Sequence, residues 1–136
     1  MLLKPLTVAS FLALLRPQQW VKNLFLFAPL IFSKHLFDPE FFRVELFAFF
    51  AFCLISSAVY ALNDIADREA DKIHPIKRNR PVASGKITVQ QALIFDSLLL
   101  LVVAVLSRDL NPKFQSTAGL YFLLNLAYSF WLKKVI

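Results

Sequence analysis

Glycine, cysteine and charge are all scarce in this 136-residue chain, which has two glycines and one cysteine. So few glycines exclude both a flexible glycine linker and the glycine-rich loops that cradle nucleotide phosphates, because each needs several residues without a side chain. The lone Cys53 cannot form an internal disulfide, and its apolar surroundings predict a small buried side chain. Only 18% of the residues are charged, against about a quarter in a typical soluble domain.

Apolar residues are abundant instead. Hydrophobic side chains make up 58% of the chain, 15 residues are Phe, and the mean hydropathy is +0.61. This excess over a soluble domain predicts a lipid-facing surface in addition to a core. The net charge of +6 comes from Lys and Arg that punctuate apolar runs. That placement is typical of membrane flanks, so the expected partner is the lipid bilayer and no nucleic acid is expected.

Four apolar stretches are close in length to the roughly 20 residues that a helix needs to cross a bilayer. They cover residues 20–37, 41–64, 87–107 and 114–132, after an apolar segment, 6–15, expected to lie at the membrane interface. Asn111 and Pro112 separate the last two, because the residue before a proline disfavours helix. Backbone groups in lipid must bond within their own segment. We therefore predict an all-α, multi-pass transmembrane bundle that forms one domain over residues 1–136.

The charged residues predict the orientation of this bundle. Residues 63–86 carry ten charges, and four spans would put both termini on the same side as this segment, together with eleven of the Lys and Arg residues, against four on the other side. By the positive-inside rule, segment 63–86 is cytoplasmic and the protein lies in the inner or plasma membrane. Asp96 falls inside an apolar stretch, where a carboxylate is costly, so it should face the bundle interior or a polar cavity.

An acidic pattern begins where the second stretch leaves the membrane. At about 100° per residue, one continuous helix would gather four oxygen-bearing side chains within an arc of roughly 100°: Asn63, Asp64, Asp67 and Asp71. Like charges on one helical face repel one another unless a cation lies there. Mg²⁺ prefers oxygen ligands and commonly bridges one or two carboxylates and substrate phosphates. The pattern predicts a magnesium diphosphate site, and the alternative is a solvated helix end neutralised by Arg68 and Lys72.

A basic loop follows, bounded by Pro75 and Pro81, which interrupt helices. It places three cations next to the acidic residues: Lys77, Arg78 and Arg80. Arg grips phosphate through paired hydrogen bonds and Lys acts as a point charge, so contact with phosphates is expected. The alternative is a loop that only anchors the topology. His74 is either a phosphate donor or a structural residue.

These motifs resemble those of a known family. Asn63 and the three aspartates match the NDxxDxxxD motif of the UbiA superfamily of intramembrane transferases. The loop from His74 to Gly85, with Arg16 before Pro17 and Lys22 before Asn23 upstream, is most similar to the decaprenyl-phosphate phosphoribosyltransferase branch. The resemblance implies a fold of roughly nine transmembrane helices, Mg²⁺ as cofactor and isoprenoid substrates.

The activity implied by this resemblance is transfer of 5-phosphoribose from phosphoribosyl pyrophosphate to a polyprenyl phosphate. By the same resemblance, Asp64, Asp67 and Asp71 would be catalytic and, with Asn63, would hold Mg²⁺ on the leaving pyrophosphate. The implied substrate-binding residues lie at the same cytoplasmic mouth: Lys22, Asn23, Asn63, Lys77, Arg78 and Arg80. Arg16 and Trp20 either belong to this mouth or anchor the chain at the membrane interface.

Two other functions remain open. One is a UbiA-type prenyltransferase that moves an isoprenoid from its diphosphate to an acceptor, and the other is a non-catalytic membrane fragment. Family members carry a second acidic motif in a later loop and are about twice as long, whereas the only acidic residues after Asp71 are Asp96 and Asp109. We therefore expect the N-terminal half of such a fold, with a complementing C-terminal half or a second copy as partner.

Overall fold

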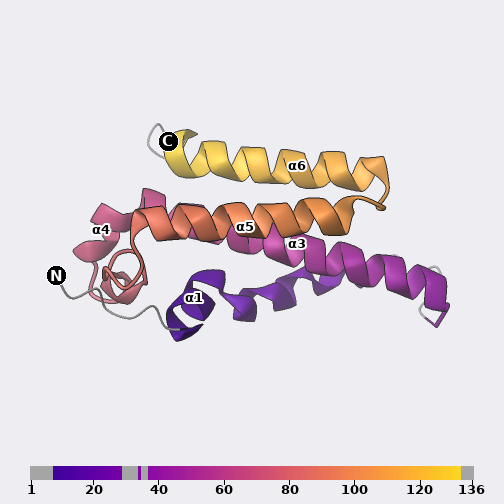
Figure 1. The fold of residues 1–136 in the computed structure, drawn as a ribbon, viewed down its shortest axis with the longest axis horizontal. Helices are drawn as coiled ribbons and strands as arrows, with labels where there is room; N and C mark the ends of the chain where they lie inside the picture. Colours follow the sequence, from indigo (N-terminus) through magenta and orange to yellow (C-terminus); the bar gives the residue numbers. More distant parts are fainter. Residues whose placement is uncertain (1–7, 29–33, 35–36, 133–136) are drawn as a thin grey trace.

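The computed structural model describes residues 8–28, 34 and 37–132, and within them every regular element is a helix (Figure 1). The α-helices are α1 (Val8–Leu15), α3 (Pro39–Ala66), α4 (Arg68–Lys72), α5 (Val89–Ser107) and α6 (Pro112–Ala127). Two 3₁₀ helices, η1 (Pro17–Phe27) and η2 (Lys77–Asn79), and a π-helical turn, η3 (Tyr128–Leu132), complete the set. The predicted all-α fold is confirmed.

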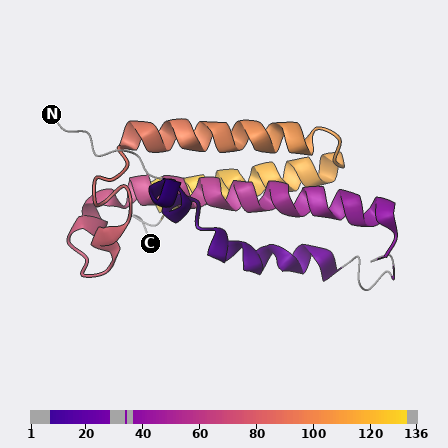
Figure 2. The same ribbon diagram turned by 60° about the horizontal axis from the view of Figure 1, so that its bottom comes forward.

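The longest helix, α3, is the element on which the others pack. Its 28 residues contact α1, η1, α5, α6 and η3, as the two ribbon views show (Figures 1 and 2). One core cluster, at the C-terminal end of α3, joins Leu14 of α1, Leu62 and Ile65 of α3, and Val82 and Ile87 of the loop before α5. The cluster brings α1, the end of α3 and the basic loop together.

Local sequence explains where two of the long helices begin. Asp38 caps α3 by accepting a hydrogen bond from the Glu40 backbone N–H at 3.1 Å, and Pro39 takes the first helical position. Asn111 and Pro112 repeat this arrangement at the start of α6. The Asn-Pro pair therefore separates α5 from α6, as predicted.

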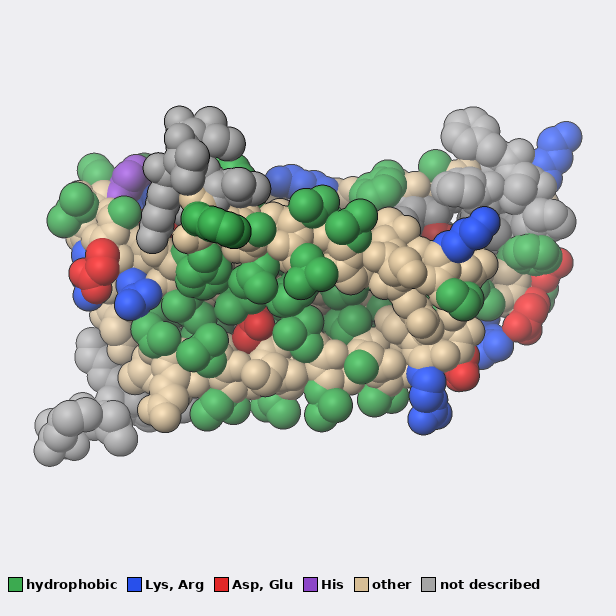
Figure 3. Space-filling model, turned by 90° about the horizontal axis from the view of Figure 1, so that it is seen from above, with side chains coloured by type: hydrophobic (Ala, Val, Ile, Leu, Met, Phe, Trp, Pro, Cys, Tyr) green, Lys and Arg blue, Asp and Glu red, His purple; other side chains and the backbone are tan. Residues whose placement is uncertain are grey.

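Two helices among the described residues are long and apolar enough to cross a membrane: Pro39–Ala66 and Val89–Ser107. They match the predicted stretches 41–64 and 87–107. Figure 3 shows hydrophobic side chains along the middle of one face and charged ones mostly toward the two ends. Stretch 114–132 is also helical, but its α-helix has 16 residues and continues as η3. The total number of spans stays a prediction.

The first predicted span differs from the other three. Its beginning is wound as the 11-residue 3₁₀ helix η1, while residues 29–33 and 35–36 lie outside the described part of the chain. At about 2.0 Å of rise per residue, η1 reaches roughly 22 Å. The interfacial segment expected at 6–15 corresponds to α1, of which residues 6 and 7 are not described.

Two single-residue predictions concern the interior of the bundle. Cys53 is fully buried and Asp96 is 4% exposed, so both are confirmed as interior side chains. Among the described residues, Asp96 Oδ1 has no hydrogen-bond partner.

Candidate functional site

The acidic motif lies where α3 passes into α4. α3 ends at Ala66, Asp67 occupies the junction with φ −96° and ψ 4°, and α4 begins at Arg68. The single helix assumed for the motif is therefore interrupted. Backbone hydrogen bonds from Asp67 N to Asn63 O, at 2.9 Å, and from Asp71 N to Asp67 O, at 2.8 Å, nevertheless keep helical spacing across the junction.

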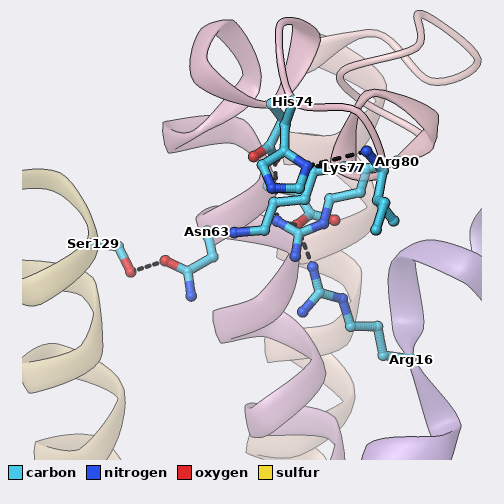
Figure 4. Close-up of polar contacts among 9 residues, drawn as sticks. Arg16, Asn63, His74, Lys77, Arg80 and Ser129 are labelled. Atoms are coloured by element: carbon cyan, nitrogen blue, oxygen red, sulfur yellow. Dashed lines mark hydrogen bonds and ion pairs between the residues drawn. The ribbon is translucent and has the colours of Figure 1, made fainter.

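Two arginines from distant segments converge on Asp64 (Figure 4). Arg16, between α1 and η1, donates to Asp64 Oδ1, and Nη1 of Arg80 lies 3.6 Å from the same oxygen. Arg80 Nη1 also donates to Asp71 Oδ2 at 3.1 Å. Asp64 is 1% exposed and Asp71 is 4% exposed. Carboxylates removed from water in this way need cationic partners, and the arginines supply them.

Several contacts place the Arg16 guanidinium at this end of α3. Its backbone has a φ of 54°, a left-handed conformation that is uncommon for a residue other than glycine. The guanidinium carbon lies 5.1 Å from the centroid of the Tyr60 ring, in cation–π geometry. On either side, Trp20 Nε1 donates to Ser57 Oγ at 2.9 Å, and Ser57 Oγ donates to the Leu15 carbonyl at 2.6 Å. These bonds attach Leu15, before Arg16, and Trp20, after it, to Ser57 of α3.

The loop after α4 divides the predicted cations into two groups. Arg80 is half-buried against the carboxylates, whereas Lys77 and Arg78 are exposed. His74 shapes the loop, because its Nδ1 accepts hydrogen bonds from the backbone N–H groups of Ile76 and Lys77, each at 3.1 Å. This favours the structural interpretation of His74. Lys77 and Arg78 are left accessible to an anion from solution.

Lys22 and Asn23 lie away from the carboxylates. Lys22 is exposed, while Asn23 is 6% exposed and donates from Nδ2 to Ser56 Oγ at 3.4 Å and to Cys53 Sγ at 3.5 Å. Ser56 precedes Asp64 by two turns of α3, or about 12 Å along the helix axis. The structure therefore ties Asn23 to the middle of α3, and a substrate contact by either residue stays a prediction.

Asn63 is separated from the arginine cluster. Ser129 Oγ, in η3, donates to Asn63 Oδ1, and Ser129 is 2% exposed. In Figure 4 the Asn63 side chain points toward Ser129, while Arg16 and Arg80 lie on the other side of α3. The predicted four-residue face is thus shared between two neighbours, the basic loop and the end of the α6–η3 helix.

The described residues include no group of three or more His, Cys, Asp or Glu side chains positioned to hold a metal ion together. One oxygen does suit a cation: Asp64 Oδ2 is buried and has no hydrogen-bond partner in the described part of the chain. Asp71 lies near Asp64, because Arg80 Nη1 contacts both carboxylates. Since Mg²⁺ often needs only one or two protein carboxylates besides phosphate oxygens and water, Asp64 fits as one carboxylate ligand of such an ion.

The contacts of two residues of the site are not specified by the sequence patterns. For Arg16 the sequence leaves two places open, the cytoplasmic mouth and the membrane interface, and the need of a buried acidic cluster for nearby cations favours the mouth. Ser129 carried no signal, because a serine inside an apolar helix is common and its partner Asn63 lies 66 residues away in sequence.

Fold and site together define a class of protein: an apolar helical bundle of membrane type with buried carboxylates and arginines at one end of its longest helix. The model of the UbiA prenyltransferase family matches residues 23–136. The chain therefore belongs to the UbiA prenyltransferase family, whose members are integral membrane proteins.

Curated relatives support the same assignment. The chain is 39% identical over 94% of its length to the uncharacterized protein y4nM of Sinorhizobium fredii, of which it covers 25%. It is 36% identical over 93% of its length to decaprenyl-phosphate phosphoribosyltransferase of Mycolicibacterium smegmatis, of which it covers 41%. A shorter match, 35% identical over 57% of the chain, covers 27% of 4-hydroxybenzoate octaprenyltransferase of Polynucleobacter asymbioticus. The chain spans less than half the length of each of these relatives.

Proposed function

We propose that the protein transfers 5-phosphoribose from phosphoribosyl pyrophosphate to a polyprenyl phosphate at the cytoplasmic face of the membrane, with Mg²⁺ as cofactor. One structural observation carries this proposal. Buried Asp64 and Asp71 lie against Arg80 at the end of an apolar helix, and exposed Lys77 and Arg78 follow in the same loop. Similarity over 93% of the chain to a phosphoribosyltransferase supports this choice of substrates.

The chemistry asks little of the protein beyond placement and charge. A lipid phosphate is already an anion, so its oxygen can attack without a strong base, and catalysis consists of positioning and stabilisation of the leaving group. Asp64, Asp67 and Asp71 would hold the ion, which supplies Lewis acidity toward the leaving pyrophosphate. Lys77 and Arg78 bind diphosphate oxygens from the exposed side of the loop. Arg80 stays beside the carboxylates, where its positive charge offsets the repulsion between them.

The membrane arrangement belongs to the same proposal. Four spans, of which α3 and α5 are two, bring the acidic end of α3 and the basic loop to the cytoplasm of the inner or plasma membrane. The helices form the N-terminal part of a nine-helix bundle, completed by a C-terminal half or a second copy. A cysteine introduced at exposed Lys86 tests the orientation, because a membrane-impermeant thiol reagent should label it only from the cytoplasmic side.

A UbiA-type prenyltransferase is the second candidate, favoured by the match to an octaprenyltransferase. Both activities use a magnesium diphosphate leaving group, so the acidic motif does not separate them. A competition experiment separates the two activities. Phosphoribosyl pyrophosphate should displace a bound prenyl diphosphate only if the ribosyl substrate is the natural one. A chain that binds neither compound would be the non-catalytic membrane fragment.

The direct test measures pyrophosphate release in membranes that contain the protein, supplied with Mg²⁺, phosphoribosyl pyrophosphate and polyprenyl phosphate. Asp67→Asn should lower the rate roughly 100-fold, the scale for loss of one charge-stabilising group. Glu69→Gln is the matched control, because the Glu69 side chain is 74% exposed and pairs with Lys72. Equal rates for the two variants would contradict the proposed role of the acidic motif.

A further inference from the structure

The hydrogen bond between Ser129 and Asn63 joins two helices at a buried point. Ser129 is 2% exposed and lies in η3, the five-residue π-helical turn that continues α6. π-Helical turns widen the helix locally and occur frequently at functional sites. Here the turn carries the Ser129 hydroxyl to Asn63 Oδ1, on the helix that bears the acidic motif.

This bond decides which atoms Asn63 offers to a ligand. An amide side chain has one acceptor oxygen and two N–H donors. Oδ1 accepts from Ser129, whereas Nδ2 has no hydrogen-bond acceptor among the described residues. A metal ion needs the oxygen, but Figure 4 shows Oδ1 turned toward Ser129 and away from the side of α3 where Arg16 and Arg80 lie. Asn63 therefore presents donors, which suit an anion.

The side-chain contacts, rather than the rotation around the helix, separate Asn63 from Asp64 and Asp71. At about 100° per residue, Asn63 falls about 100° from Asp64 but only about 40° from Asp67. Asp64 and Asp71 share Arg80, and Asn63 shares nothing with them in the described structure. The amide thus borders the carboxylate group instead of joining it.

We propose that Ser129 is a positioning residue that fixes the Asn63 amide, so that Nδ2 donates to an oxygen of the substrate diphosphate and Asn63 is not a metal ligand. The proposal rests on the proposed function and refines it. The protein ligands of the cation then come from the carboxylates, and Asn63 contacts the diphosphate next to it. This removes Asn63 from the metal set that the family resemblance implied.

Two separate binding measurements on the purified chain in detergent test this division. Mn²⁺ binding, followed by electron paramagnetic resonance, reports on the metal ligands, and calorimetric titration with phosphoribosyl pyrophosphate reports on the anion site. Asn63→Leu should leave Mn²⁺ affinity within about twofold and weaken phosphoribosyl pyrophosphate binding about 10-fold or more, the scale for a hydrogen bond to a charged group. Asp67→Asn should instead weaken Mn²⁺ binding.

Ser129→Ala should show the same split in a milder form, and Ser129→Thr, which keeps the hydroxyl, should restore phosphoribosyl pyrophosphate affinity. Circular dichroism confirms that each variant is folded, and a purely structural role would change both affinities together or neither. Loss of Mn²⁺ binding in Asn63→Leu comparable to that in Asp67→Asn would overturn the inference while leaving the proposed function intact. If the unaltered chain binds neither Mn²⁺ nor phosphoribosyl pyrophosphate, the proposed function is overturned, and the inference with it.

Discussion

Replacing Arg80 by Met should destabilise the fold far more than replacing Lys72 by Met, although the two cations make ion pairs of nearly equal length. Arg80 Nη1 lies 3.1 Å from Asp71 Oδ2, and Lys72 Nζ lies 3.0 Å from Glu69 Oε1. Burial distinguishes them. The Asp71 side chain is 5% exposed and the Glu69 side chain is 74% exposed.

The magnitude follows from what each substitution leaves behind. Without Arg80, Asp71 loses its cation and Asp64 keeps only Arg16. Removal of one member of a buried ion pair costs about 3–5 kcal/mol. Because the Arg80 side chain is 29% exposed and Arg16 remains, we expect the lower end of that range, about 3 kcal/mol. The exposed pair of Lys72 and Glu69 should contribute about 0.5 kcal/mol.

Chemical unfolding in detergent, followed by circular dichroism, measures both free energies. A double variant sharpens the test: Asp71→Asn combined with Arg80→Met removes the carboxylate charge that Arg80 compensates, so it should recover at least about 1 kcal/mol relative to Arg80→Met alone. The reasoning would be refuted if Arg80→Met and Lys72→Met lowered the free energy of unfolding equally, or if the double variant recovered no stability. Either result would show that burial does not make the carboxylates depend on Arg80.

Three further substitutions probe other parts of the fold by the same unfolding assay. Ser57→Ala should cost about 2 kcal/mol, because it leaves the Trp20 indole N–H without its acceptor, whereas Ser97→Ala, on the exposed side of α5, should cost under about 0.5 kcal/mol. Thr88→Ala removes the capping box of α5 and should cost about 1 kcal/mol. Asp96→Asn should change stability by less than about 0.5 kcal/mol, since Oδ1 of the native carboxyl is unpaired in the described structure, and a loss above about 2 kcal/mol would reveal a partner.

Much of the helical framework could be predicted, because its determinants are local. Apolar runs as long as a bilayer core predicted α3 and α5, and the predicted break at Asn111 and Pro112 coincides with the N-terminal cap of α6. The 3₁₀ winding of η1 was not predictable from composition. It depends on contacts with α3, such as the bond between Trp20 and Ser57, that join residues 37 positions apart.

The acidic cluster was predicted in composition but not in organisation. A repeat of about 100° per residue predicted one four-residue face, and the structure pairs Asp64 and Asp71 with Arg80 but Asn63 with Ser129. In a helical bundle, an arc of roughly 100° is wide enough to face two neighbouring elements. Asp64 meets Arg16 across 48 positions, and Asn63 meets Ser129 across 66, and no local pattern specifies such pairs. For the same reason, the sequence grouped Asn63 with the carboxylates although its hydrogen bond points elsewhere.

The polar bonds of the candidate site are also the bonds that hold separate segments at one end of α3. Asp64 fixes the turn between α1 and η1 through Arg16, Asp71 fixes the basic loop through Arg80, and Asn63 fixes the end of η3 through Ser129. An anion that draws either guanidinium from its carboxylate would therefore loosen a contact between elements. A cation bound at that carboxylate would compensate its charge but would not rejoin the two elements. A ligand that binds here would act on the helix positions through the same few atoms, because Asn63, Asp64 and Asp71 lie within a little over two helical turns of α3 and α4.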